Sequence, residues 1–519
     1  MSQAITTPET KTTYADPTKT LVYGHPIGLA NLFFTELWER FSYYGMRALL
    51  VLYMTAALAD GGLGYSTPRA AFIYGLYTGA VYIVALPGGW IADNILGARH
   101  AVLVGGIIIA LGHFSMAMPQ IEFFYAGMIL IVLGTGFLKP NISSMVGSLY
   151  ENNPRRDAGF SIFYMGINIG AGISPLVCGY LAQSSAFKTF LSSNGYNPLG
   201  SWHWGFGAAG VGMSIGLIFY VSMFRFIKHV GNKPEKPTTS PAVLAVILLV
   251  GLGLFAAVAY SISQSSYVNT VTENLPKILN VVVLLIGPTA MGIILYYLRA
   301  SGASKEDFRR VLVICVLFFF SAVFWSAFEQ AGSSLNLFAE KLTRNSIFGW
   351  DFPSSYFQSV NSMFIILLAP VFTFVWTVLG KREPSSPAKF SFGLFFVGVG
   401  FLILVVASTL AVGGVKVAPF WLVAVYFFHT VGELCLSPVG LSTVTKLAPA
   451  KLVGMMMGIW FLSLSLGNYM GGVIAGYFDP NAEGALVTLF GSVAALTILP
   501  AALLFVLTPS IKKLMGGIK

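Results

Sequence analysis

The chain has 519 residues, of which 56% are hydrophobic and only 10% are charged. Soluble domains carry about 25% charged residues, so this composition excludes a soluble globular protein. The formal charge of +10 lies mainly between the apolar stretches, where it indicates membrane topology and not binding to nucleic acid.

The apolar residues fall into fourteen stretches, each long enough to cross a hydrocarbon layer of about 30 Å as a helix. We expect helices because backbone polar groups in lipid must form hydrogen bonds within their own segment. In chain order the expected spans are 28–57, 70–92, 101–118, 123–147, 158–183, 203–224, 241–262, 278–298, 311–338, 355–380, 390–413, 418–445, 452–477 and 485–508.

Two polar breaks, at 225–240 and 299–310, divide these spans into groups of six, two and six. Paired six-helix bundles around a midplane site are typical of secondary transporters. We therefore predict an all-α membrane protein with two further helices between its bundles. The predicted parts are a tail at 1–27, a bundle at 28–227, a linker with two transmembrane helices at 228–308, a bundle at 309–508 and a tail at 509–519.

The basic residues indicate the orientation of the chain. If the N-terminus is cytoplasmic, most of the 30 Lys and Arg residues fall on the inner side, including Arg155, Arg225 and Lys381. This excess follows the positive-inside rule and predicts that both termini are cytoplasmic. The polar, Thr-rich first 27 residues contain no apolar core of a signal peptide, so we expect no cleavable one.

The three cysteines indicate neither a disulfide framework nor a metal site. Cys178, Cys315 and Cys435 lie far apart within apolar spans, where a small hydrophobic side chain is the simplest interpretation. We expect no cofactor.

Charged side chains inside the spans are candidate functional residues, because a charge within the bilayer is unfavourable. If the spans are renumbered without the two extra helices, these charges occur on spans 1, 4, 7 and 10. Such spacing predicts one charged helix per three-helix repeat around a central cavity. The residues are Glu36, Glu39, Arg40, Arg47, Lys139, Glu329 and Glu433.

On span 1, Glu36, Arg40, Tyr43 and Arg47 share one helical face. They could form ion pairs that only hold the bundle together, but buried ion pairs contribute little to stability, so a functional role is favoured. Burial favours a protonated carboxyl and a nearby cation favours the ionised form. Glu329 could therefore act as a proton switch, with Lys139 or Arg47 as its cation.

Glu433 on span 10 has two interpretations. It could form a hydrogen bond between helices, or it could pair with the amine of a substrate, which we favour. His429 lies four residues earlier on the same face, and a packing role is favoured over a proton relay. Tyr74, Tyr77 and Tyr82 on span 2 could line a pocket or belong to a membrane-interface belt.

Several motifs resemble those of the proton-dependent oligopeptide transporter (POT) family. The segment Glu36-Leu-Trp-Glu39-Arg40-Phe-Ser-Tyr43-Tyr44-Gly45 resembles the family motif ExxERFxYYG, and residues 160–170 resemble a second family signature. Residues 328–330 and 432–438 are also similar to family patterns. The segment 89–99 resembles the loop motif of the major facilitator superfamily. The resemblance extends from about residue 25 to residue 508.

The resemblance implies a proton-coupled symporter that imports di- and tripeptides by alternating access. In the family, the Glu36, Glu39 and Arg40 cluster would couple protons together with Lys139, and Glu329 would alternately pair with Arg47. Arg47 and Lys139 would attract the peptide carboxylate, and Glu433 its amino group. The positions that would line the substrate pocket are Tyr43, Tyr44, Tyr82, Asn168, Asn361, Ser437 and Trp460.

The resemblance further implies a monomer in a bacterial cytoplasmic (inner) membrane, with protons as the coupling ion and no nucleic-acid partner. Span 2 lacks the histidine of animal members, and the segment 414–417 is too short for their extracellular domain. Both departures favour a bacterial member.

Other functions remain as alternatives. A transporter of the same fold could carry nitrate, although the acid-rich first span and Glu433 argue against a simple anion site. A passive channel or a receptor is a further possibility. An enzyme is less favoured because the sequence shows no nucleophile–base or metal cluster. No GxxxxGK phosphate loop is present, which disfavours an ATP-driven pump.

Overall fold

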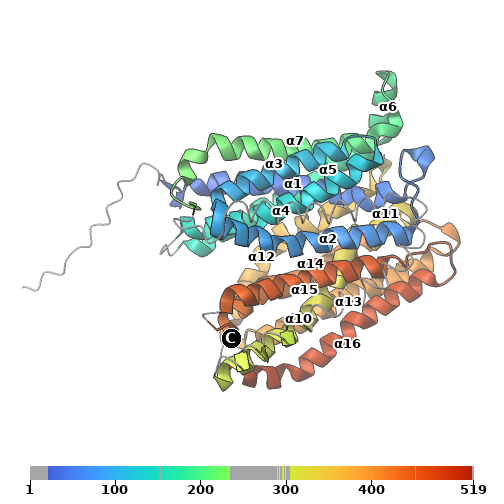
Figure 1. Ribbon diagram of the computed structural model, residues 1–519. Helices are drawn as coiled ribbons and strands as arrows, with labels where there is room; N and C mark the ends of the chain where they lie inside the picture. The colour runs from blue at the N-terminus through green and yellow to red at the C-terminus, as the bar shows by residue number, and fades with distance from the viewer. Residues whose placement is uncertain are drawn as a thin grey trace, which may run out of the picture.

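The computed structural model describes residues 21–150, 155–233, 304–449 and 452–516, with a few residues between 289 and 299. Within these ranges every expected span except 311–338 coincides with a single long helix (Figure 1). In the N-terminal half these are α1 (Gly28–Thr55), α2 (Thr67–Ile91), α3 (Ala98–Met116), α4 (Ile121–Leu149), α5 (Arg156–Gln183) and α7 (Ser201–Ser222). In the C-terminal half they are α10 (Lys305–Phe328), α12 (Gln358–Leu379), α13 (Ser386–Leu410), α14 (Phe420–Leu447), α15 (Val453–Ala475) and α16 (Ala485–Leu514).

Eleven helical segments of the described chain are long and apolar enough to cross a membrane. Helix α1 has 28 residues but is not among them. Every stretch of it that could span a membrane contains at least three of Glu36, Glu39, Arg40 and Arg47. The expected spans 241–262 and 278–298 lie outside the described residues, apart from a few positions of the second. The total of fourteen spans therefore stays a prediction.

The expected span 311–338 is not a single helix. Helix α10 ends at Phe328, a 3₁₀ turn η6 covers Glu329–Gly332, and the short helix α11 covers Ser334–Leu342. Between the two helices Ser333 adopts φ −126° and ψ −94°, which interrupts the helical hydrogen bonds. The apolar pattern runs through this break, so hydrophobicity gave no sign of it.

The remaining described elements lie in the connections. They include α6 (Ser185–Ser193), which the sequence analysis did not predict, and two antiparallel two-stranded hairpins. Strand β1 (Leu21–Val22) pairs with β2 (His25–Pro26), Leu21 opposite Pro26. Strand β3 (Ser346–Ile347) pairs with β4 (Trp350–Asp351), Ser346 opposite Asp351.

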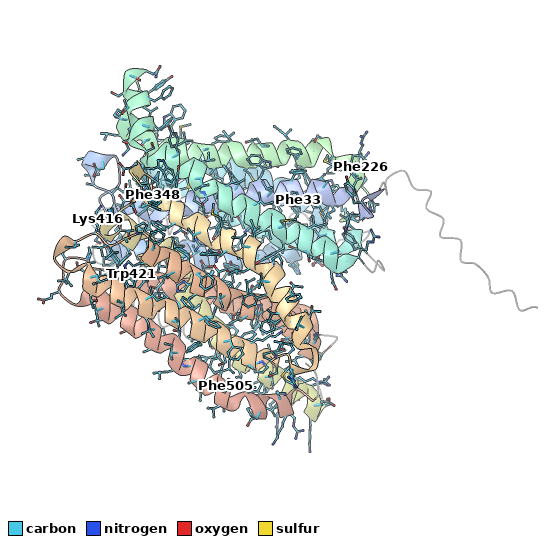
Figure 2. The ribbon with its side chains drawn as sticks, turned by 180° about the vertical axis from the view of Figure 1, so that it is seen from behind. Phe33, Phe226, Phe348, Lys416, Trp421 and Phe505 are labelled. Atoms are coloured by element: carbon cyan, nitrogen blue, oxygen red, sulfur yellow. The ribbon has the colours of Figure 1, made fainter. Side chains whose placement is uncertain are left out.

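The helices form two bundles, α1–α7 and α10–α16, that lie side by side (Figure 1). We call the end of the molecule where α1 begins and α16 ends the tail side, and the opposite end the far side. Figure 2 shows Lys416, Trp421 and Phe348 on the far side and Phe226 on the tail side. Large apolar side chains such as Phe505 (56% exposed) and Val506 (74% exposed) point outward, as expected for helices in lipid. The chain is a multi-pass membrane protein.

In the far-side halves of their helices the two bundles contact each other backbone to backbone. A Cβ atom on Gly472 of α15 would lie 2.4 Å from the Cα of Gly75 on α2, so the two backbones touch. The Ser465 hydroxyl donates to the Gly79 carbonyl over 2.8 Å between the same helices. On the opposite flank, a Cβ on Gly179 of α5 would lie 2.1 Å from Ser355 Oγ. The far side is therefore closed.

The tail-side halves of the bundles diverge (Figure 1). A cavity of about 1010 Å³ lies there, lined by the first half of α5, the last halves of α12 and α14, the start of α13 and Lys512 near the end of α16. The structure is therefore closed on the far side and has a cavity on the tail side. The buried charges lie between the closed side and this cavity.

Candidate functional site

The first charged cluster lies entirely on α1. The Arg40 guanidinium contacts the carboxylates of both Glu36 and Glu39, with 3.0 Å between Arg40 Nε and Glu36 Oε1. All three side chains are buried, and Glu39 is completely inaccessible. Several of their nitrogen and oxygen atoms have no hydrogen-bond partner within the described residues. Since unsatisfied buried polar atoms are unfavourable, this cluster is a poor source of stability.

A second ion pair joins the two bundles. Arg47 Nη2 of α1 contacts Glu329 Oε2 of η6, and both side chains are more than nine-tenths buried. Arg47 Nε also donates to the Tyr74 hydroxyl of α2 over 2.7 Å. A Cβ at Gly332 would lie 2.0 Å from that hydroxyl and 3.0 Å from Arg47 Nε. The helix break at η6 and the absence of a side chain at Gly332 therefore let the pair form.

Lys139 of α4 forms no ion pair in the described part of the chain. Its Nζ lies 4.0 Å from the centre of the Tyr82 ring on α2, a cation–π contact. It is nevertheless close enough to Glu36, Glu39 and Glu329 to interact with them electrostatically. The sequence analysis paired Lys139 with the α1 cluster. In the structure Arg40 contacts both carboxylates of that cluster, while Glu36 Oε2 and Glu39 Oε1 have no hydrogen-bond partner among the described residues.

Glu433 of α14 is half-buried and faces an amide of the same bundle. Asn361 Nδ2 of α12 lies 3.0 Å from both Glu433 Oε2 and Thr430 Oγ1, so it donates toward both. Glu433 has no ion pair with a described basic residue. Its charge is therefore available to a cation that the described protein does not supply.

The other residues predicted to line a pocket lie in different surroundings. Tyr43 and Tyr44 pack edge to face, and the guanidinium carbons of Arg40 and Arg47 lie 5.6 Å from their respective ring centres. Asn168 and Ser437 line the tail-side cavity. Trp460 is 3% exposed and packs on Phe390 and over Gly440 inside its own bundle.

His429 and the three cysteines have the packing roles expected for them. The His429 ring is buried between Phe401 and Phe328, with ring centres 5.0 and 6.2 Å away. All three cysteines are free thiols. Among the described residues no group of three His, Cys, Asp or Glu side chains could hold a metal ion.

Comparison with known proteins identifies the family of this chain. A family model described as "POT family" matches residues 99–488, most of the chain. The chain belongs to the POT family.

Relatives of this POT-family chain match it over nearly their whole length. Peptide transporter YePEPT of Yersinia enterocolitica is 40% identical, covering 95% of this chain and 96% of the relative. A di-/tripeptide transporter of Lactococcus lactis is 36% identical over 97% of this chain and 99% of its own. A crystal structure of a variant of peptide transporter POT with alafosfalin superposes with a TM-score of 0.84 at 37% identity, covering 96% and 98% of the two chains. These matches confirm the predicted family and the major-facilitator fold.

The POT-family structure also shows functional candidates that the sequence analysis missed. Gln358 of α12 donates to the Ala331 carbonyl of η6 over 2.5 Å and to the Tyr426 hydroxyl of α14 over 3.1 Å. Together with Tyr74, these groups hold η6 in the position where Glu329 meets Arg47. Gln358 and Tyr426 are ordinary polar residues in apolar helices, and nothing in their sequence spacing marks them as neighbours of Glu329.

Proposed function

We propose that this chain is a proton-coupled symporter that imports di- and tripeptides by alternating access. The observation that carries the proposal is the buried pair of Arg47 and Glu329, one charge from each bundle. The names of its relatives, which describe transporters of peptides, support the choice of substrate.

The ion pair gives protons a way to act on the arrangement of the bundles. Ionised Glu329 binds Arg47 and holds the far-side halves together, alongside the Asn336 amide of α11, which donates to the Ala48 carbonyl of α1 over 2.8 Å. A proton on Glu329 removes the negative charge, so the attraction to Arg47 falls and the far side can open. Proton binding and far-side opening are then linked.

The substrate charges complement charges on opposite bundles. A peptide zwitterion has a carboxylate, which Lys139 and Arg47 of the first bundle attract, and an amine, which Glu433 of the second bundle attracts. Because these groups recognise only the peptide termini, the site would restrict peptide length and tolerate many side chains. The pocket walls in this proposal come from Tyr43, Tyr44, Tyr82, Asn168, Asn361, Ser437 and Trp460.

A peptide carboxylate at Arg47 competes with Glu329 and so favours the open far side in the same sense as a proton. The far side closes again when Glu329 loses its proton and re-forms the pair with Arg47. The Glu36, Glu39 and Arg40 cluster with Lys139 would exchange the proton on the tail side.

In this proposal the protein acts as a monomer in a bacterial cytoplasmic membrane, with the tail side and both termini in the cytoplasm. The proton is the coupling ion of the transporter, and the proposal includes no cofactor. The six-helix bundles at 28–227 and 309–508 are the moving units.

Uptake into proteoliposomes tests the proposal. Purified protein should accumulate radiolabelled dialanine above equilibrium when the lumen is more alkaline than the medium, and a protonophore should abolish the accumulation. Dialanine uptake that only equilibrates under every gradient would indicate a passive channel and would contradict symport.

Competition separates the peptide from the anion alternative. Unlabelled dialanine should inhibit the uptake, whereas nitrate at the same concentration should not, because nitrate offers no amine to Glu433. Proton-driven nitrate uptake without dialanine uptake would contradict a peptide site.

A further inference from the structure

Helix α6, which connects α5 to α7, has one apolar and one polar face. At about 3.6 residues per turn, Phe187, Phe190 and Leu191 fall on one face of this helix. The opposite face consists of polar and basic side chains, namely Ser185, Lys188, Thr189 and Ser192. No acidic residue occurs in α6 or between α6 and α7. Such a distribution is typical of helices that lie in a membrane interface.

The apolar face of α6 is directed toward the membrane interior. The Phe187 ring packs against Tyr180 of α5 and Trp204 of α7, with ring centres 6.1 and 6.0 Å away. Each of these partners lies about one turn inward from the far-side end of its own helix. Phe190 stacks on Phe187, with 5.9 Å between the ring centres, but remains 56% exposed. The Phe190 ring therefore faces the surroundings of the protein at this depth.

Helix α6 adjoins the lipid-facing surface of the first bundle. It lies at the far-side end of this bundle and runs across the direction of α7 (Figure 1). Because the bundle helices cross the bilayer, a helix across their direction runs along the membrane surface. On α7, Trp204, Val211 and Ile218 recur every seven residues and are each at least 47% exposed. Tyr196, just before α7, contacts the Trp204 ring at 6.0 Å, and such amphipathic aromatic rings are enriched at membrane interfaces.

We infer that α6 binds the lipid surface of the far-side leaflet and that Phe190 inserts at the boundary between headgroups and acyl chains. The exposed Phe190 ring loses contact with water there, and the Lys188 ammonium can reach lipid phosphates. The hydroxyl-bearing face of α6 stays in water. The orientation of the apolar face favours lipid over a soluble protein partner, because that face points into the membrane and not away from it.

This anchor holds the far-side end of α5 at a fixed depth. Helix α5 ends at Gln183, and α6 begins two residues later. Gln183 Nε2 donates to Ser354 Oγ over 3.0 Å and to Glu340 Oε2 over 3.2 Å, both in the second bundle. The lipid surface therefore fixes one side of a far-side contact between the bundles. This role does not depend on which solute the protein transports.

Spin labels on cysteine variants of the full-length protein in lipid nanodiscs test the inference. A label at Phe190→Cys should collide more often with molecular oxygen, which partitions into lipid, than with a water-soluble nickel chelate. Ser192→Cys is the matched control, because Ser192 lies two residues away on the polar face. Its label should collide more often with the nickel chelate. The signal of labelled native cysteines is subtracted, and both new positions are exposed, so neither label should disturb folding.

Two outcomes would overturn the lipid anchor. A preference for the nickel chelate at both positions would place α6 in water. Protection of the Phe190→Cys label from both reagents would assign the apolar face to a protein contact, and dipolar broadening between labels would identify that contact as a second copy of the chain.

Discussion

Arg47 contacts residues of both bundles. It contacts Glu329 of the second bundle and Tyr74 of the first, and its guanidinium lies over the Tyr44 ring. Breaking a buried pair by removing one partner leaves an uncompensated charge, which destabilises by about 3–5 kcal/mol. A change from carboxylate to amide at Glu329 also leaves the Arg47 charge uncompensated, but it keeps the shape of the side chain and an oxygen that can accept a hydrogen bond from Arg47.

Lys139 provides a prediction for a single residue. Lys139→Ala should abolish gradient-driven accumulation of dialanine, because the ammonium near Glu36, Glu39 and Glu329 is lost. Exchange of labelled for unlabelled dialanine should persist. Both rates are measured in proteoliposomes.

The control for this change is Lys416→Ala, which removes the same charge from an exposed position on the far side. Its accumulation should equal that of the native protein. Undiminished accumulation by Lys139→Ala would remove Lys139 from the coupling scheme.

Glu433 gives a prediction about affinity. Glu433→Gln should weaken dialanine binding about ten- to a hundredfold, because a charge-assisted hydrogen bond contributes about 1.5–3 kcal/mol. The amide can keep a contact with Asn361, so folding and expression should change little. Isothermal titration of the purified protein measures the affinity.

N-acetyl-dialanine, which has no amine, is the matched ligand for this experiment. It should bind the native protein more weakly than dialanine does, and its affinity should be the same for the native protein and for Glu433→Gln. A native affinity of Glu433→Gln for dialanine would contradict amine recognition.

At the scale of secondary-structure elements, close contacts between helix backbones determine how the two bundles pack. Gly75 and Gly472 bring the backbones of α2 and α15 together, and Gly472→Ala would place a methyl group 2.4 Å from backbone atoms that cannot turn aside. Overpacking of this kind costs about 1–3 kcal/mol. Gly472→Ala should therefore favour opening of the far side.

Labelling of a cysteine at Ser355, which is fully buried on the far side, measures this opening. Its reaction with a membrane-impermeant maleimide should be faster in Gly472→Ala, after subtraction of labelling at the native cysteines. Gly458→Ala is the control, because a Cβ there would meet only a terminal methyl of Leu86, at 3.0 Å. Equal labelling in both variants would contradict the role of the glycine contact.

The helices were predictable from the sequence because about twenty consecutive apolar residues have few alternatives in a bilayer. The break at Glu329–Gly332 was not, because residues 311–338 remain largely apolar through it and the polar groups that hold it come from other helices. Gln358 of α12 satisfies η6, and Tyr74 of α2 satisfies Arg47, only after the helices within each bundle have packed. The same holds for Lys139, whose contact with the Tyr82 ring depends on how α4 packs against α2.

At the scale of the whole molecule, the charged side chains connect two bundles that touch on the far side and diverge on the tail side. The sequence indicated which helices carry the charges, since spacing by three spans reflects the internal repeat. It did not indicate which side is closed, because closure depends on small differences in packing between two arrangements of the same helices. The pairing of Arg47 with Glu329 belongs to the arrangement seen in this structure.

The most direct measurement compares net uptake with exchange for Glu329→Gln in the same proteoliposomes. The variant should lose dialanine accumulation under an imposed proton gradient, because the amide cannot take up and release the proton, yet it should keep dialanine exchange. Glu122→Gln, at an exposed position on the far side, should retain both activities. Proton-driven accumulation by Glu329→Gln at the native rate would contradict the switch at this ion pair.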